Sequence, residues 1–274
     1  MTTRRVAVVT GASSGIGMHT ALAFARRGYA VVLAARRLEK LQEVAEACKA
    51  AGSPDTPLVV PTDITDRQQV QAMVNKAVEE FDRIDVMVNN AGFGQFGRVH
   101  ELSDAQIRAI FDVNFFGVFY GCRAVVPVMM RQRSGHIFNV SSVIGKRATP
   151  FHGAYCATKF AVVGLTEALR VEMAPFNVRV TCVCPALTAT EFFEKSRGGR
   201  STQSRYVRPE SMTRPEKVAR KIARTVGRRK PELVFTAGGR FFVVLGTLWP
   251  AAADWIMKFY YADLAEKHLP ADGG

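Results

Sequence analysis

The stretch VAVVTGASSGIG, residues 6–17, decides the fold of this chain. Its first five residues are an apolar run bounded by Gly11, and residues 16–27 then show helical spacing of apolar positions. A buried strand, a tight glycine turn and a helix are therefore predicted in that order. Further strands are predicted at 30–35, 58–62, 86–89, 136–140 and 178–183, and helices at 38–51, 66–81, 104–131 and 154–174.

Strands that are apolar on both faces and separated by helices indicate a parallel sheet covered on both sides. The handedness of the crossovers makes the sheet doubly wound, so we predict an α/β, Rossmann-type fold. Without a linker or an internal repeat, residues 1–274 are predicted to form a single domain.

After Pro185 the pattern changes. Residues 187–214 are polar, basic and glycine-containing, which predicts a mobile lid over a substrate pocket. Residues 233–236 could form a last edge strand, and 237–268 are predicted to be a hydrophobic helical extension of the same domain.

The extension allows two interpretations. Residues 241–253 carry no charge, but thirteen residues are too few to cross a bilayer, and Pro250 and Asp254 interrupt the run. The segment could form a helical hairpin that packs on the domain or on a second subunit. Alternatively, its aromatic residues could rest on a membrane; they are Trp249, Trp255, Phe259, Tyr260 and Tyr261.

The composition is that of a folded globular protein, with 48% hydrophobic residues. The five cysteines are odd in number and lack metal-ligand spacing, so we predict reduced, buried thiols and no metal site. Cys182 and Cys184 alternate along a predicted strand and should face the same side. The short, basic start shows no secretion signal, so a cytoplasmic location is expected.

The net charge of +13 is concentrated in residues 195–230, which hold thirteen Lys or Arg and two Glu. This stretch could be a solvated surface. It could also attract an acidic partner, such as a phosphate-bearing substrate, an acidic carrier protein or an anionic membrane. No nucleic acid is expected as a partner, because the stretch has little aromatic interleaving and matches no nucleic-acid-binding signature.

The glycine turn predicts a dinucleotide site. Glycines at a first strand–helix junction let the backbone approach a pyrophosphate, and the helix N-terminus adds N–H donors and partial positive charge. Arg36 and Arg37 follow the second strand, where an acidic residue would bond the ribose 2′-hydroxyl. A guanidinium fork suits a 2′-phosphate, so NADP(H) is favoured, although one arginine could merely begin the next helix.

Three residues predict hydride-transfer chemistry. Tyr155 and Lys159 stand four apart on a predicted helix and share a face, and Ser142 follows the strand at 136–140. An ammonium beside a phenol lowers the pKa of the phenol, so Tyr155 could act as general acid or base at a carbonyl or alcohol oxygen. Ser142 could bond that oxygen and stabilise its developing charge.

Taken together, these motifs resemble the short-chain dehydrogenase/reductase family, and in particular its NADP-preferring members. TGASSGIG matches the family's TGxxxGxG, residues 89–92 match its NNAG, and Ser142, Tyr155 and Lys159 match its serine and YxxxK. The resemblance runs from about residue 6 to residue 190.

The resemblance implies further roles. Asn114 would complete a catalytic tetrad and hold a water beside Lys159, which would also bond the nicotinamide ribose. Asp63 and Ile64 would flank the adenine, and Arg36 lies at the position used by NADP-preferring members. The full set of residues expected at the dinucleotide is Gly11, Ser13, Ser14, Gly15, Ile16, Gly17, Arg36, Arg37, Asp63, Ile64, Asn90, Ala91, Gly92, Tyr155, Lys159, Pro185, Thr188 and Thr190.

Two departures from the family pattern stand out. The family's Pro-Gly after the sixth strand is Pro185-Ala186, and Thr188 replaces the aliphatic residue of PGxVxT, although Thr190 is kept. The common glycine-rich C-terminus is replaced by the hydrophobic residues 241–261.

These features predict a carbonyl reductase or alcohol dehydrogenase for a small, apolar substrate. Phe93, Phe96 and Phe151 lie in loops expected beside the site and suggest an apolar wall, although core packing explains at least one of them. His152 is expected to be a pocket or surface residue rather than a second acid. A lipid-like or steroid-like ketone and a 3-oxoacyl thioester on an acidic carrier are alternative substrates. A non-catalytic NADP(H)-binding regulatory module is a third hypothesis. The helices at 104–131 and 154–174 have excess apolar residues, and in the family they build a dimer, so a homodimer or homotetramer is expected.

Overall fold

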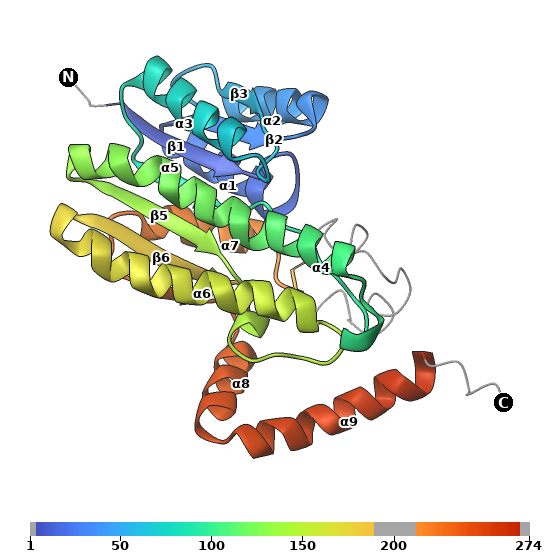
Figure 1. Ribbon diagram of the computed structural model, residues 1–274. Coiled ribbons are helices and arrows are strands. Elements are labelled where there is room, and N and C mark those ends of the chain that lie inside the picture. The colour runs from blue at the N-terminus through green and yellow to red at the C-terminus, as the bar shows by residue number, and fades with distance from the viewer. Residues whose placement is uncertain (1–3, 189–211, 269–274) are drawn as a thin grey trace.

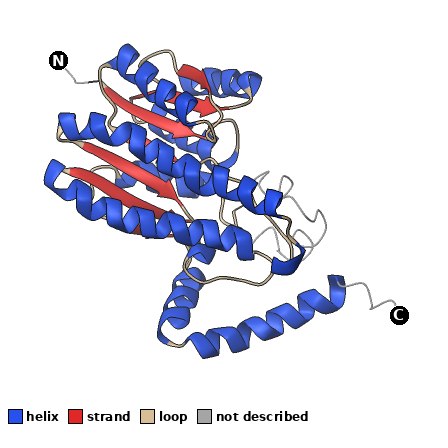
Figure 2. Ribbon diagram, viewed as in Figure 1, coloured by secondary structure: helices blue, strands red, loops and turns tan. Residues whose placement is uncertain are grey.

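A parallel sheet of seven strands forms the centre of the computed structural model, which describes residues 4–188 and 212–268, with side chains to residue 259 (Figures 1 and 2). The spatial order is β3-β2-β1-β4-β5-β6-β7. The α/β, doubly wound fold predicted from the sequence is confirmed. The strands are β1 (Arg5–Thr10), β2 (Tyr29–Ala35), β3 (Leu58–Pro61), β4 (Val86–Asn89), β5 (Gly135–Val140), β6 (Val178–Cys184) and β7 (Glu232–Val234).

Helices cover both faces of the sheet. One apolar core lies under α1, α2 and α7, and a second core lies under α3, α5 and α6 on the opposite face. The strands are buried nearly throughout, which explains why they read as continuous apolar runs. The helices of these two layers are α1 (Gly15–Ala25), α2 (Leu38–Ala50), α3 (Arg67–Phe81), α5 (Gly117–Gln132), α6 (Gly153–Met173) and α7 (Pro215–Thr225).

The strand order reverses beside β1, which pairs with β2 on one side and with β4 on the other. In doubly wound sheets, ligands bind at such a switch point, outside the carboxyl ends of the strands. That edge carries the glycine turn after Thr10 and the residues that follow β4 and β5, so the topology brings all of the predicted motifs to one side.

The helix predicted at 104–131 is continuous from Asp104 to Gln132 but changes geometry within it. It consists of α4 (Asp104–Phe111), a π-helical turn η2 (Asp112–Phe116) and α5. This helix is long and apolar enough to cross a membrane. Half of its most apolar window is buried inside the protein, as expected for a helix that covers a sheet.

The C-terminal extension is helical, as predicted. It consists of α8 (Ala237–Leu248), capped by the Thr236 hydroxyl, and α9 (Pro250–His268). In Figure 1, α8 leaves the body of the molecule below α6, where it contacts η3 (Val143–Gly145), and α9 continues at a sharp angle to α8. Residues 189–211 of the predicted lid lie outside the described residues; at its ends, Thr188 forms a bridge with Thr213.

Candidate active site

The glycine turn has the shape that an approaching phosphate requires. Gly11 and Gly15 adopt left-handed backbone conformations, with φ of +64° and +54°. A Cβ at Gly17 would lie 2.2 Å from the Gly11 carbonyl oxygen, so only glycine fits. Ser14 begins α1 without a side-chain cap, which leaves the first N–H groups of the helix to bond a ligand at this edge.

Arg37 lies over the same turn. Its guanidinium Nη2 donates to the hydroxyls of Ser13, at 3.1 Å, and Ser14, at 3.2 Å. Arg37 is also the residue that precedes α2, so one arginine both begins the helix and faces the turn. Arg36 is exposed beside it.

The end of β4 is bonded to the end of β1. The Thr10 hydroxyl accepts from the backbone N–H of Asn90, at 3.0 Å, and of Ala91, at 3.2 Å. The Asn90 amide in turn donates to the Thr10 carbonyl at 3.0 Å. These bonds hold the NNAG segment beside the glycine turn and leave Gly92 at the strand edge.

Asp63 and Ile64 follow β3 at the same edge. Asp63 accepts from the backbone N–H and the hydroxyl of Thr65, at 3.0 and 2.8 Å, which fixes the orientation of its carboxylate. The Ile64 side chain is buried against Gly117 at the start of α5. The side chain of Ile64 is therefore occupied by core packing, and of the predicted adenine pair Asp63 is the one whose side chain lies at the surface.

Ser142, Tyr155 and Lys159 meet at the carboxyl end of β5. A hydrogen bond joins the Tyr155 phenol to the Ser142 hydroxyl. The Lys159 Nζ lies 5.5 Å from the centroid of the Tyr155 ring and donates to the Val140 carbonyl at 3.0 Å. The spacing of these three residues in the sequence predicts that they lie together, and in the structure they do.

The pKa of the phenol departs from the expected direction. Burial raises the pKa of Tyr155, and the hydrogen bond with Ser142 opposes that rise. The lowering by ammonium that the sequence predicts is not seen: the phenol is desolvated, and the Lys159 amine donates to the Val140 carbonyl. Burial also lowers the pKa of Lys159 to about 8, so the amine still carries a proton at neutral pH.

Asn114 lies in the π-helical turn η2 and is fully buried. Its amide exchanges two hydrogen bonds with the backbone of Phe93, both at 2.9 Å, and donates a third to the Thr158 hydroxyl at 3.3 Å. A Cβ at Gly92 would lie 3.0 Å from the Asn114 Oδ1 and 3.6 Å from the Lys159 Nζ. Asn114 therefore lies close to the Lys159 amine, in a π-turn of the kind that recurs at functional sites.

The segment after β6 closes the site. The Pro185 carbonyl accepts from the Val143 N–H at 3.0 Å and from the Ser142 hydroxyl at 3.4 Å. The Thr188 hydroxyl donates to the Ala186 carbonyl at 2.8 Å and is buried, so it braces this turn. Thr190 lies outside the described residues.

The predicted apolar wall forms in two parts. Phe96 stacks on Phe151 with ring centroids 5.2 Å apart, and His152 packs edge-on against Phe96 at 5.4 Å. Phe93 packs instead against the small core cluster that contains Tyr155. Phe151 has a φ of +63°, an unusual conformation for an aromatic residue and one that concentrates at ligand sites.

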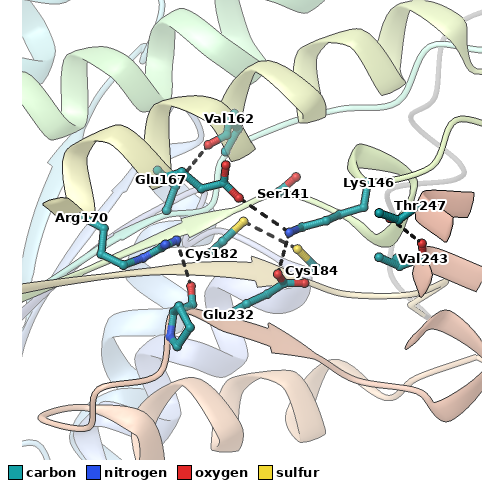
Figure 3. A network of polar contacts seen from close by, with 12 residues as sticks. Ser141, Lys146, Val162, Glu167, Arg170, Cys182, Cys184, Glu232, Val243 and Thr247 are labelled. Carbon is teal, nitrogen blue, oxygen red and sulfur yellow. Dashed lines mark hydrogen bonds and ion pairs between the residues drawn. The ribbon is translucent and has the colours of Figure 1, made fainter. Parts of the chain in front are cut away.

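A polar network lies beneath the segment that follows Ser142 (Figure 3). The Lys146 ammonium is 2.6 Å from the Glu232 carboxylate of β7 and 3.8 Å from that of Glu167 on α6. Burial is the largest influence on the pKa of Lys146 and lowers it, but the hydrogen bond and the charge of Glu232, with smaller contributions from Cys184 and Cys182, together raise it. The thiols of Cys182 and Cys184 lie 3.6 Å apart beside this network, buried and on the same side of β6 as predicted.

Three supporting residues were not found from the sequence. The Thr158 hydroxyl donates to the Tyr155 carbonyl at 2.7 Å and accepts from Asn114, so it links two site residues. The Ser141 hydroxyl donates to the Lys159 carbonyl at 2.9 Å, and Lys146 anchors the loop. The positions of Thr158 and Ser141, directly beside Lys159 and Ser142, are the only sequence signal for those two residues, and Lys146 has none.

The residues at this edge fit a dinucleotide. The glycine turn admits no Cβ at Gly17, the N-terminus of α1 faces outward, and Arg37 offers a guanidinium beside two hydroxyls. Gly92 provides a side-chain-free position beside Lys159, where a flat ring could approach the buried amine and phenol.

Comparisons with known proteins agree with this geometry. The family description for short chain dehydrogenase matches residues 5–201. The 3-oxoacyl-acyl-carrier-protein reductase of Thermotoga maritima is 37% identical over 191 residues, which are 70% of this chain and 77% of that protein.

Solved structures give the same result. A short-chain dehydrogenase/reductase from Burkholderia phymatum in complex with NAD has a TM-score of 0.82 and 30% identity, covering 89% of this chain and 93% of that chain. An alcohol dehydrogenase from Thermococcus sibiricus, complexed with 5-hydroxy-NADP, has a TM-score of 0.75 and 30% identity, covering 85% and 96%.

Proposed function

The chain belongs to the short-chain dehydrogenase/reductase family, and from that premise we propose that it is an NADP(H)-dependent oxidoreductase acting on a carbonyl or a secondary alcohol. The nicotinamide, when bound, supplies or accepts the hydride. The observation that carries the proposal is the hydrogen-bonded pair of Tyr155 and Ser142, with the Lys159 amine 5.5 Å from the phenol ring.

In the direction of reduction, the Tyr155 O–H donates a proton to the substrate oxygen as negative charge develops there. The Ser142 hydroxyl donates a hydrogen bond to the same oxygen. Lys159 carries positive charge at neutral pH and stabilises the phenolate that Tyr155 leaves behind. Oxidation of an alcohol uses the same groups in reverse, with Tyr155 accepting the proton.

Arg37 supports the preference for NADP(H). Its guanidinium, held beside the hydroxyls of Ser13 and Ser14, forms a positively charged donor cluster suited to a 2′-phosphate. No carboxylate follows β2 in the position that would bond a 2′-hydroxyl, because Arg36 and Arg37 occupy it. Because one similar structure holds NAD and another holds an NADP derivative, the cofactor preference of this chain is the first point to test.

An apolar ketone is the substrate class that the aromatic wall favours. Phe96 and Phe151 stack on one another in loops that the topology brings to the site. A 3-oxoacyl thioester on an acidic carrier is a second candidate, supported by the 37% identity to the Thermotoga reductase and by the basic residues of this chain.

The experiment is NADPH oxidation against a panel of ketones, aldehydes and 3-oxoacyl thioesters, repeated with NADH. Turnover of apolar ketones, with NADPH preferred, supports the proposal. Turnover confined to carrier-bound thioesters and lost as ionic strength rises favours the second candidate, because salt screens carrier docking. Binding of NADPH without consumption of any substrate favours a regulatory module.

We also propose that the protein is a homodimer or homotetramer. Phe116, Phe119 and Phe160 are each more than a third exposed on the outer faces of η2, α5 and α6. Aromatic side chains in that position are typical of a surface that a second subunit covers.

A further inference from the structure

The C-terminal extension exposes an unusual amount of apolar surface. Half of the large hydrophobic side chains that lie exposed in the described residues fall between 241 and 259. Their exposed fractions include 78% for Leu248, 69% for Trp249 and 62% for Trp255. We call this set the α8–α9 surface; its members are Phe241, Val244, Leu248, Trp249, Trp255, Ile256 and Phe259.

The spacing of these residues makes continuous stripes. Phe241, Val244 and Leu248 recur at i, i+3 and i+7, so they share one face of α8. Trp255 and Phe259 stand four apart on α9, with ring centroids 4.7 Å apart. An exposed stripe of this kind, joined to exposed aromatic residues, marks a surface that another body covers.

The extension is attached to the domain without hiding this surface. Arg147 donates to the Pro250 carbonyl at 3.3 Å and pairs with Asp254. Ala253, next to Asp254 in α9, is fully buried, and at the start of α8 Gly239 lies beside Val143 of η3. The attachment uses the polar and small residues, and the aromatic residues face outward.

Positive charge borders the α8–α9 surface. Arg240 precedes Phe241, and Lys258 precedes Phe259; both are exposed. The pKa of Lys221 on α7 is lowered by burial and then by Arg240, Lys217 and Lys230, so these four cations lie close to one another. The extension as a whole, residues 237–268, holds Arg240, Lys258 and Lys267 against Asp254, Asp263 and Glu266. Arg147 neutralises Asp254, so with the α7 cations the balance at this face is positive.

We propose that the α8–α9 surface docks the enzyme on an anionic lipid bilayer. An apolar aromatic face bordered by cations is the arrangement that binds an interface of acyl chains and acidic headgroups. A second copy would bring like charges together, which makes it the weaker occupant. The twelve residues of α8 cannot span a bilayer, and α9 carries charged residues such as Asp254 and Lys258 along its length, so both helices would lie in the plane of the interface.

Docking has a consequence for the site that goes beyond the proposed oxidoreductase function. The start of α8 packs beside Val143, the residue after Ser142. The bilayer surface therefore lies close to the loop that closes the substrate site, where an apolar substrate could arrive from the membrane.

The full chain provides its own probe for a test. Its two tryptophans, Trp249 and Trp255, both belong to the α8–α9 surface. Their fluorescence is recorded while vesicles of phosphatidylcholine, with or without phosphatidylglycerol, are added, and binding is measured separately by vesicle flotation. We expect a blue shift and flotation with phosphatidylglycerol vesicles, at least about tenfold weaker with phosphatidylcholine alone because the electrostatic attraction is lost.

Variants distinguish the surface from a general effect of charge. Leu248→Glu and Phe259→Glu should each weaken vesicle binding at least about tenfold, since a large apolar side chain no longer enters the interface. Val171→Glu is the matched control, because Val171 is 74% exposed on α6, away from the extension; it should bind as the wild type does.

Three outcomes would overturn the proposal. One is the absence of flotation with anionic vesicles. Another is equal weakening by Val171→Glu and by the two extension variants, with all three melting like the wild type. The third is a blue shift that grows with protein concentration in the absence of lipid and disappears in Leu248→Glu, which would assign the surface to a second copy. NADPH-dependent turnover without vesicles tests the proposed function independently.

Discussion

The side chain of Asn114 and the backbone of Phe93 bond each other twice. The Phe93 N–H donates to Asn114 Oδ1, and Asn114 Nδ2 donates to the Phe93 carbonyl, each at 2.9 Å. The pair fastens the loop after β4 to the π-turn, so Asn114 holds the chain beside Gly92 as well as standing near Lys159.

Asn114→Asp should therefore weaken both folding and activity. The carboxylate cannot donate to the Phe93 carbonyl, and its charge would be fully buried. We expect the free energy of unfolding in urea to fall by about 1–3 kcal/mol and kcat to fall by about tenfold or more. Asn114→Asp with unchanged stability and unchanged kcat would contradict this assignment.

Arg37 and Arg36 offer a matched test of cofactor preference. Arg37→Ala removes the guanidinium over the glycine turn and should raise the Kd for NADPH about tenfold or more, while the Kd for NADH changes little. Arg36→Ala removes an exposed neighbour of equal charge and should have the smaller effect. Fluorescence titration measures both. An equal loss of NADH and NADPH affinity in Arg37→Ala would show that the arginine supports the fold of the turn instead.

Tyr155→Phe removes one oxygen from the proposed acid. We expect kcat to fall by a factor of about 100 to 10,000, the range for a positioned general acid, with NADPH still bound and a melting temperature close to the wild-type value. Stopped-flow measurement of NADPH oxidation with an apolar ketone gives the rate. A variant that retains most of its kcat would remove Tyr155 from the mechanism.

The pH profile of reduction should follow Lys159. Burial disfavours the charged form and lowers the pKa of the amine to about 8, so positive charge is lost as pH rises through that value. Tyr155, whose pKa is raised, keeps its proton over the same range. We expect kcat/KM for reduction to be level below about pH 7.5 and to fall about tenfold per pH unit above about pH 8.5. A profile that stays level to about pH 10 would mean that the charge is not needed.

The buried His136 should make the stability of the fold sensitive to acid. Burial and, secondarily, Arg179 lower the pKa of the imidazole to about 3, and its ring nitrogens contact the Thr181 hydroxyl and the Gly227 N–H. The unfolded chain binds a proton below about pH 6.5, whereas the folded chain does not, so stability falls as pH falls. Between about pH 6.5 and about pH 4.5 this group contributes a loss of about 2 kcal/mol.

Urea unfolding at the two pH values measures the loss. The same pair of measurements on His136→Gln serves as the control, because the variant retains polar atoms but does not titrate. The variant should lose less stability on acidification than the wild type does. Equal losses in both proteins would show that other groups cause the acid sensitivity.

The strands and the glycine turn could be predicted from the sequence because they depend on local patterns. The runs at 86–89 and 136–140 correspond closely to β4 and β5. The expected last strand at 233–236 is β7, which begins one residue earlier and ends two residues earlier. The π-turn at Asp112–Phe116 could not be predicted, since one wider turn does not disturb the apolar spacing of a long helix.

The electrostatics of the site also required the structure. The spacing of Tyr155 and Lys159 predicts that they share a helix face, but the direction of the phenol pKa depends on burial by residues distant in the chain. Similarly, the family resemblance singles out Arg36 as the residue at the NADP position, whereas the structure places Arg37 over the glycine turn. Their difference depends on how α2 begins, which turns one side chain over Ser13 and Ser14 and the other outward.

Two hydrogen bonds, one from the side chain and one to the backbone, fasten Lys159 to the carboxyl end of β5. Its amine bonds the Val140 carbonyl, and its own carbonyl accepts from the Ser141 hydroxyl, so one turn of α6 cannot slide or rotate against the strand. The aromatic loops around Phe96 and Phe151 share neither bond. Substitutions or insertions in those loops can therefore change substrate specificity while Tyr155 and Lys159 keep their alignment. Such a scaffold can acquire new ketone substrates without rebuilding its acid–base residues.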